Sequence, residues 1–243
     1  MSGHSKWAQI KHQKGTADAK RGTLFTKLGN NITIAAREGG GGDPVMNFKL
    51  RIALENAKKS NMPKENMERA IKRGTGELKG SSIEEIVYET FIPGGAALLI
   101  YALTDNKNRA VGNIRRILSK YGIELGAANS VSWMFEKKGV IRIADYKNKI
   151  SDFEKFQLDL IENGAEDIQE QDTDLTIYTE MANLQKVKEY LEKQKINPDY
   201  ASVEPVAKNK VKLEDPKLSS KLENLFQELN DDEDINDYYS NLE

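Results

Sequence analysis

The chain has 243 residues, of which 38% are hydrophobic and 30% are charged, and it contains no cysteine. This length suits two or three compact domains, and the apolar content is sufficient for hydrophobic cores. The lack of cysteine excludes disulfides, thiolate zinc sites and cysteine nucleophiles. No apolar run approaches the roughly 20 residues that span a bilayer, and neither a secretory signal nor a transit segment is recognisable. We therefore expect a protein of the bacterial cytoplasm.

Charge is distributed unevenly, although the formal net charge is only −2. Residues 1–80 hold 16 Lys and Arg against 7 Asp and Glu, which gives about +9, and residues 81–243 hold 20 against 31, which gives about −11. This split predicts separate modules with separate partners, because a basic module attracts polyanions. The alternative is a lysine-rich surface that only keeps the helices solvated.

Residues 1–80 are expected to form a basic all-helical domain that begins with an arm over 1–15. Apolar residues at three- and four-residue spacing predict a helix over 18–38, with Leu24 among its buried residues. The glycine run after this helix ends it. Asp43 is expected to cap a second helix that carries Met46 on its apolar stripe, and a third helix is predicted over 63–73.

The pattern changes to strands after residue 80. Residues 86–92 and 96–103 predict two strands joined by a tight turn, and the second strand should be buried on both faces. The next helix is capped by Asn106 or Asn108. Val131–Phe135 is expected to be a further strand.

A second unit has the predicted order β-α-β-β-α-β, which is the ferredoxin-like arrangement. Its strands are expected at 140–143, 165–170, 175–179 and 200–206, and its helices at 151–163, with Ile161 inward, and at 182–193. Strands 140–143 and 165–169, taken as the central pair, lack the two aromatic residues with which RNA-recognition sheets stack on bases.

The segment 216–229 is amphipathic, and the acidic Asp231–Asp234 after it is expected to be a frayed tail. Because 81–135 is one helix short of a two-layer unit, we expect this segment to return and complete it. The predicted fold class is α+β multidomain, with a helical N-terminal domain and two α+β, ferredoxin-like domains, the third inserted in the second. The predicted domains are 1–80, 81–137 with 206–243, and 138–205.

Catalytic chemistry has little support in the sequence. The two histidines, His4 and His12, both lie in the arm and have no carboxylate cluster beside them for a metal. No nucleophile elbow is present, and the glycine runs follow helices rather than the strand that a phosphate loop requires. We expect no enzyme activity, no catalytic residue, no metal, no cofactor and no small-molecule substrate.

Cations are frequent in the arm and on the predicted helices. The arm surrounds Trp7 with basic residues, and a flat ring among cations is typical of nucleic-acid contacts. The apolar stripes point elsewhere, so most cations are expected to face outward together. The helices carry Arg51, Lys58, Lys59, Lys64 and Arg69 in addition to the residues given below. Docking of Trp7 onto the helical core is the alternative.

A series of motifs runs through the chain in order and resembles the YebC/PmpR family. The series is Gly3-His4-Ser5-Lys6-Trp7, Asp18-Ala19-Lys20-Arg21-Gly22, Ala35-Ala36-Arg37-Glu38-Gly39-Gly40, Asn61-Met62-Pro63-Lys64, Arg69-Ala70-Ile71-Lys72-Arg73-Gly74-Thr75-Gly76 and Ala102-Leu103-Thr104-Asp105-Asn106. Two departures are a fourth glycine after Glu38 and Phe91-Ile92 before Pro93, where Tyr-Gly is commoner.

The resemblance implies a three-part fold and a regulator without enzymatic activity. Bacterial members are described as transcriptional regulators that bind promoter DNA, whereas others, like the related mitochondrial translational activator, act on ribosomes and ease synthesis through proline runs. We therefore expect DNA, or ribosomal or transfer RNA, as the partner; self-association is open, and no membrane is expected. The implied nucleic-acid-binding residues are Lys6, Trp7, Lys11, His12, Lys14, Lys20, Arg21, Lys27, Arg37, Lys72 and Arg73.

Overall fold

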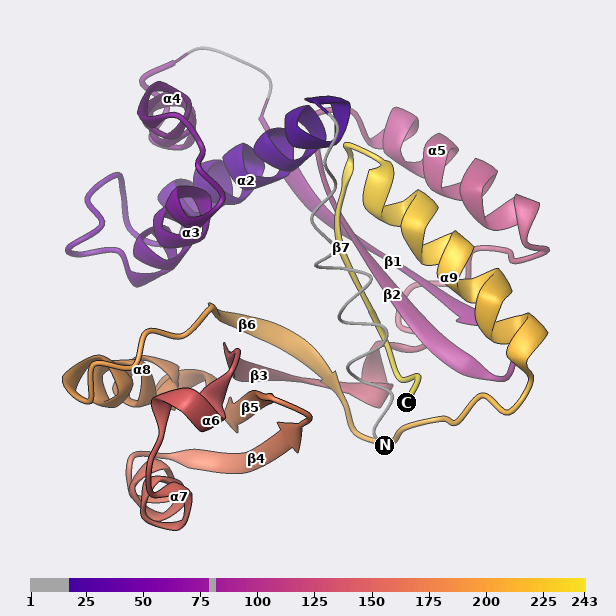
Figure 1. Cartoon of the computed structure of the whole chain (residues 1–243). Coiled ribbons are helices and arrows are strands. Elements are labelled where there is room, and N and C mark those ends of the chain that lie inside the picture. Colours follow the sequence, from indigo (N-terminus) through magenta and orange to yellow (C-terminus); the bar gives the residue numbers. More distant parts are fainter. Residues whose placement is uncertain (1–17, 79–81) are drawn as a thin grey trace. The chain divides into compact units, whose positions relative to one another are not determined.

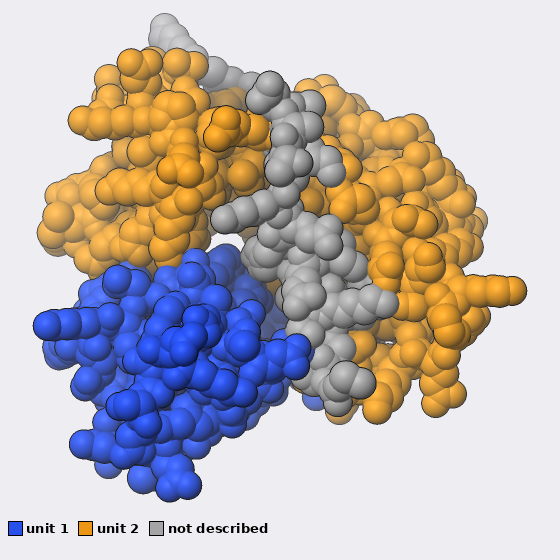
Figure 2. Space-filling model, viewed as in Figure 1, with its two compact units in different colours: residues 1–5, 135–208 blue, residues 6–134, 209–243 orange. Residues whose placement is uncertain are grey.

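The computed structural model describes residues 18–78 and 82–243, with side chains from residue 21 onward. The chain divides into two compact units, which Figure 2 colours separately. Of the described residues, the first unit holds 135–208, and the second holds those up to Met134 together with 209–243. Each unit is described by itself.

Among the described residues, the N-terminal part of the second unit consists of helices (Figure 1). They are α2 (Asp18–Glu38), α3 (Phe48–Lys59) and α4 (Lys64–Gly74). Their shared core forms because apolar residues recur once per turn on each helix, and it includes Ile32, Ala36, Leu50, Ala57, Met67 and Ala70. Leu24, which was expected in this core, is 43% exposed.

The start of α3 differs from the expected cap at Asp43. The carboxylate of Asp43 accepts the amide of Val45 at 2.8 Å and so closes a turn rather than a helix end. The helix begins at Phe48, because the Asn47 side chain accepts the amide of Leu50 at 3.0 Å and caps it. The expected role of Met46 in the apolar stripe is wrong, since Met46 is 81% exposed.

The second unit also contains an antiparallel sheet of three strands in the order β1-β2-β7. These strands are β1 (Glu84–Ile92), β2 (Ala96–Thr104) and β7 (Ile235–Ser240). Helices α5 (Lys107–Lys120) and α9 (Pro216–Asp231) pack in one core with the sheet, as Figure 1 shows. Strand β2 is almost wholly buried, as its continuous apolar run predicted, and Asn106 caps α5.

Two expectations for this sheet are wrong. Ser132–Met134 forms a short 3₁₀ turn instead of a strand, and Phe135 opens a strand of the other unit. The acidic stretch Asp231–Asp234 is not a frayed tail, because Asp234 is buried and Ile235–Ser240 pairs with β2. A charged run can end in a strand when one of its carboxylates finds a cation inside the fold.

The first unit is a four-stranded antiparallel sheet in the order β4-β5-β3-β6. Its strands are β3 (Phe135–Ile143), β4 (Ala165–Gln171), β5 (Asp174–Thr179) and β6 (Tyr200–Ala207), and its helices are α6 (Tyr146–Lys149), α7 (Phe153–Glu162) and α8 (Leu184–Lys193). A 3₁₀ turn over Met181–Asn183 leads into α8. The β-α-β-β-α-β order and this strand order are those of a ferredoxin-like fold.

The two central strands of this sheet are β5 and β3, so the expected central place of 165–169 is wrong: that segment is the edge strand β4. The true central strand β5 carries one aromatic residue, Tyr178, which is 9% exposed. Ile161, which was expected to face inward, is 57% exposed.

The predicted fold class is confirmed: an N-terminal helical region precedes two sheets in a mixed α and β protein. The chain leaves the three-stranded sheet after α5, forms the four-stranded sheet, and then returns to the three-stranded sheet through α9 and β7. The domain boundaries at 80, 137 and 206 stay a proposal.

Candidate nucleic-acid interface

Five of the predicted contact residues lie outside the described residues: Lys6, Trp7, Lys11, His12 and Lys14. Lys20 lies in α2, but its side chain is not among those described. The arm as a binding element therefore stays a prediction, and the candidate residues that the structure describes are the cations on α2, α3 and α4.

The cations of α2 have different surroundings. Arg21 is exposed near the start of the helix. Lys27 is only 8% exposed, and its Nζ donates a hydrogen bond of 2.6 Å to the carbonyl oxygen of Asn230 in α9. The expectation that most cations face outward fails for Lys27, because its ammonium group satisfies a carbonyl at the end of α9.

Arg37 lies in the last turn of α2 and points to the segment that precedes β1. Its guanidinium donates to the carbonyl oxygen of Ile83 at 2.5 Å and to the hydroxyl of Ser82 at 3.2 Å. A carboxylate oxygen of Glu38 lies 3.5 Å from the guanidinium. Arg37 thus fastens the helical region to the sheet that follows it in the chain.

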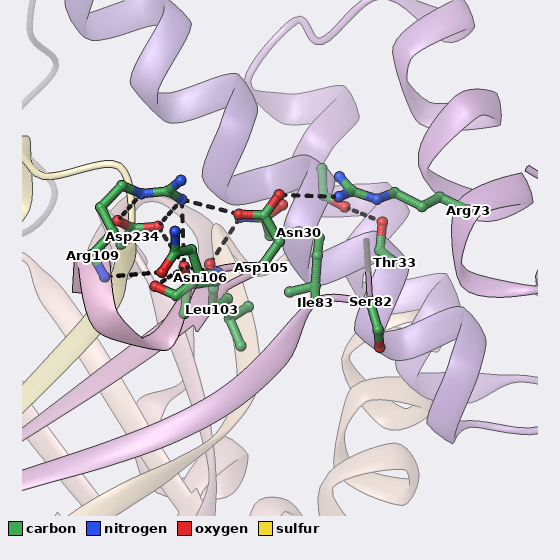
Figure 3. Close-up of polar contacts among 12 residues, drawn as sticks. Asn30, Thr33, Arg73, Ser82, Ile83, Leu103, Asp105, Asn106, Arg109 and Asp234 are labelled. Carbon is green, nitrogen blue, oxygen red and sulfur yellow. Dashed lines mark hydrogen bonds and ion pairs between the residues drawn. The ribbon is translucent and has the colours of Figure 1, made fainter. Parts of the chain in front are cut away.

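Helix α4 carries two of the predicted residues. Lys72 is exposed, whereas the guanidinium of Arg73 lies 3.9 Å from a carboxylate oxygen of Asp105, beyond the end of β2. Figure 3 shows this pair between the helical region and the sheet. Arg37 and Arg73 therefore reach the same sheet from two different helices.

A polar cluster, here named the polar junction, connects these helices to the sheet (Figure 3). Asn30 of α2 donates to the carbonyl oxygen of Leu103 at 3.1 Å. Beside it, Ile34, Ile83 and Leu103 form a small buried apolar group. The remaining members of the polar junction are Arg73, Thr104, Asp105, Asn106, Arg109 and Asp234.

Asp234 is the most buried charge of the polar junction, at 5% exposure. Arg109 donates to both of its carboxylate oxygens, at 2.8 and 2.6 Å, and the hydroxyl of Thr104 donates at 2.7 Å. Burial by itself raises the pKa of Asp234, but the bonds from Arg109 and Thr104 outweigh it and hold the pKa below its ordinary value. Its bonds to Asp234 in turn raise the pKa of Arg109.

Sequence reasoning missed Asp234 because it assigned the whole acidic run to a tail. Two aromatic residues, Tyr238 and Tyr239, follow the run, and aromatic residues are enriched in strands. That signal was available, whereas the pairing of Asp234 with Arg109, which lies 125 residues earlier in the chain, had no local signature.

The exposed cations of the helical region are the described candidates for contact with a polyanion. They are Arg21, Lys49, Lys58, Lys59, Lys64, Arg69 and Lys72. On α4, Met67 and Ala70 are buried, which places Arg69 and Lys72 on other sides of the helix. Two of the lysines lie near carboxylates: Lys64 is 3.5 Å from Glu68, and Lys49 is 3.9 Å from Glu38.

The loop between α2 and α3 is held in place by Asn47, which is 1% exposed. Its side-chain amide donates to the carbonyl oxygens of Ala35 and Gly41, both at 2.8 Å. Gly40 and Gly41 have φ values of 98° and 118°, a backbone conformation that favours glycine. The glycine run is therefore structural, as expected, and its anchor is a residue that the sequence did not single out.

Within residues 18–78 and 82–243, no group of three or more His, Asp or Glu side chains is arranged to hold a metal ion. In the same ranges, no helix combines the length and the apolar character that crossing a membrane requires.

Comparison with known proteins extends over the whole chain. Residues 5–77 match the family described as TACO1/YebC protein N-terminal domain, and residues 83–242 match the family described as TACO1/YebC second and third domain. A probable transcriptional regulatory protein of Halothermothrix orenii is 46% identical over all of this chain and 95% of its own length. One from Thermoanaerobacter pseudethanolicus is 48% identical over all of this chain and 97% of its own.

A solved structure agrees with the fold described above. The crystal structure of a conserved hypothetical protein from Aquifex aeolicus superposes with a TM-score of 0.87 at 42% identity, and it covers 98% of this chain and 97% of its own. With family matches along both parts of the sequence and homologues of equal length, the chain belongs to the TACO1/YebC family, as its resemblance to YebC/PmpR proteins implied.

Proposed function

We propose that this protein is a non-enzymatic regulator of gene expression that binds DNA through its basic N-terminal region. The observation that carries the proposal is the charge split, with about +9 in residues 1–80 and about −11 in the remainder. Closely spaced cations bind the phosphate backbone by releasing its counterions, whereas the acidic part repels it. The relatives named probable transcriptional regulatory proteins support a regulatory role.

Two sets of cations have different tasks in this proposal. Lys27, Arg37 and Arg73 position the helical region, because each reaches an acceptor on α9, before β1 or after β2. The arm and the exposed cations of α3 and α4 contact the nucleic acid. The arm residues are Lys6, Trp7, Lys11, His12 and Lys14. The ring of Trp7 supplies a stacking surface for a base.

A ribosome-associated translation factor that binds RNA and relieves stalling at proline-rich stretches is the second candidate. Most of the exposed cations on α3 and α4 are lysines, which contact phosphates as point charges and do not read base edges with a planar fork. This composition favours a ligand that is recognised by its backbone and shape, and structured RNA is such a ligand.

The binding surface can be tested by the salt dependence of binding to a labelled duplex DNA, followed by fluorescence anisotropy. Replacing Lys6, Lys11 and Lys14 together by Ala should reduce the slope of log K against log salt by about 3, because each lost phosphate contact accounts for roughly 0.9. The matched control replaces the exposed Lys193, Lys210 and Lys217 by Ala, outside the basic region. An unchanged slope in the arm variant would contradict the proposal.

The choice between DNA and RNA needs a separate comparison. If the protein regulates transcription, its affinity at moderate salt should be higher for its own promoter than for random duplex. If it is a translation factor, it should sediment with ribosomes, and a deletion strain should show altered pausing at proline codons. Equal affinity for all DNA together with ribosome sedimentation would replace the first candidate by the second.

A further inference from the structure

An open groove lies on the unit formed by residues 135–208, away from the basic helical region in sequence. It runs between helix α7 and the edge strand β4 and has a volume of about 450 Å³. Its lining residues are Glu154, Gln157, Leu158, Ile161, Glu166, Asp167 and Ile168. None of the expected nucleic-acid contacts lies in this unit.

Helix α7 has apolar residues on its exposed surface in addition to those that pack inside the unit. Phe156 and Leu160 are buried against the sheet and account for its position in the fold. Leu158 and Ile161 lie on another side of the helix and are 64% and 57% exposed. A helix with a single packed side has polar residues elsewhere, so two neighbouring exposed aliphatic side chains above a groove are typical of a contact surface.

The edge strand β4 restricts how a partner can bind. It pairs with β5 on one side only. Its Ile168 amide already donates to the carboxylate of Asp167 at 2.9 Å, and the second oxygen of that carboxylate accepts from Gln169 at 2.7 Å. Because the Asp167 carboxylate already accepts one backbone amide of this strand, a partner is better accommodated by placing side chains in the groove than by adding a strand.

The charges of the groove select the partner. Three of the seven lining residues are carboxylates (Glu154, Glu166 and Asp167), and none is a lysine or arginine. Outside the lining, Lys138 is paired with Glu166 at 2.8 Å. Carboxylates beside exposed aliphatic side chains repel nucleic acid and attract a chain with both cations and apolar side chains.

We propose that this groove binds a basic amphipathic segment of another protein, with aliphatic side chains on Leu158 and Ile161 and lysines or arginines at the carboxylates. The proposal is independent of the proposed function, because it concerns residues 135–208 and not the basic region. It gives this unit a function of its own, which is to bind a basic protein.

The test uses the full-length protein and a labelled synthetic helix of about 18 residues with leucines on one side and lysines on the others. The double variant Leu158→Gln and Ile161→Gln should weaken its binding at least about tenfold, since the aliphatic contacts at the centre of an interface carry most of its energy. Met181→Gln is the matched control, because Met181 is an exposed apolar residue of the same unit, at 52% exposure. All variants are compared by their thermal midpoints to show that they remain folded.

Three further measurements make the outcome decisive. The same peptide with glutamates in place of lysines should bind at least about tenfold more weakly, and Glu154→Gln should reduce the salt dependence of the lysine peptide. Equal binding of both peptides, or no effect of the double variant, would overturn the proposal. Concentration-dependent dimerisation that the double variant abolishes would also overturn it, because the occupant would then be a second copy of this chain.

Discussion

Asp234 shows how one side chain can decide the position of a strand. Its carboxylate is buried and receives bonds from Arg109 and Thr104, so strand β7 begins beside the end of β2 rather than in solvent. Arg109 also donates to Asp105 at 3.1 Å, and Asp105 lies near Arg73 of α4. The same carboxylate therefore stabilises the sheet and orders the residues that meet the helical region.

Replacing Asp234 by Asn should lower the free energy of unfolding by roughly 2 kcal/mol, because the buried group loses its ion pair with Arg109. Urea denaturation followed by circular dichroism measures the change. Glu233→Gln is the matched control, since Glu233 is the exposed acidic neighbour and should change stability by less than about 0.5 kcal/mol. Equal stability of the two variants would mean that the polar junction does not stabilise the fold.

Glu89 of β1 is a second buried carboxylate, at 6% exposure, and it organises the loop before β3. Its oxygens accept the amides of Asn129, Val131 and Ser132 at 2.9, 2.8 and 2.8 Å. Burial raises the pKa of Glu89, but these backbone donors outweigh it and hold the pKa below the ordinary value of 4.5. The ionised form is therefore the one that the fold stabilises.

The sign of this shift predicts a pH dependence. A carboxylate with a lowered pKa in the folded state contributes stability that is fully present above its ordinary pKa and is lost as the pH falls through the lowered value. Glu89→Gln should therefore be less stable than the wild type at pH 7, and the difference should shrink below about pH 4. Urea titrations at several pH values measure it. A difference that stays constant with pH would exclude ionisation of Glu89 as the cause.

At the scale of elements, the contact between α2 and α4 depends on a glycine. A Cβ on Gly74 would lie 2.4 Å from the carbonyl oxygen of Thr33 and 2.8 Å from the Cβ of Ala36. Gly22, also helical, has nothing within 4 Å of its Cβ position. Gly74 is therefore required by packing, whereas a substitution of Gly22 should change only the helix propensity.

Gly74→Ala should destabilise the protein by about 1–3 kcal/mol, because α4 must move away from α2. Gly22→Ala should stabilise it by about 0.5–1 kcal/mol, because alanine is the better helix former at an open position. Thermal unfolding of both variants measures these opposite changes. Stabilisation by both substitutions would show that the helices are less closely packed than the structure indicates.

Elements with a strong local period could be predicted from the sequence, and those that depend on distant partners could not. Strand β2 and helix α5 were predicted because a continuous apolar run and a capped amphipathic pattern are local signals. The full length of β3 was missed because Lys137 and Lys138 interrupt its apolar pattern. Gly139 in this strand is required by close packing, because a Cβ at this position would lie 2.4 Å from the hydroxyl oxygen of Thr179.

The candidate site was predictable to a similar degree. Charge counting located the basic region, but it could not separate exposed cations from those that hold the fold together. Lys27 bonds to Asn230, which is 203 residues away in sequence, and no pattern within α2 distinguishes it from the exposed Arg21. Separating exposed cations from structural ones needs the tertiary structure, because the sequence around a lysine on an amphipathic helix is the same whether its ammonium group is in solvent or bonded to a carbonyl.

At the scale of the whole molecule, the path of the chain predicts that the unit of residues 135–208 can be removed. Phe135 and Ala207 are paired partners at the ends of β3 and β6, so their Cα atoms lie only about 5 Å apart. A short Gly-Ser linker in place of residues 135–208 can therefore join Met134 to Asn209 and leave α9 and β7 in the same chain as β1 and β2.

This shortened protein and the isolated fragment 135–208 should each unfold cooperatively. As the contrasting variant, a chain that ends at residue 208 should not fold its second unit, since Leu222, Leu225, Phe226 and Leu229 belong to that core. Calorimetry of the three proteins measures this. A second cooperative transition in the truncated chain, in addition to that of residues 135–208, would contradict an inserted unit, and so would the lack of a transition in the linked protein.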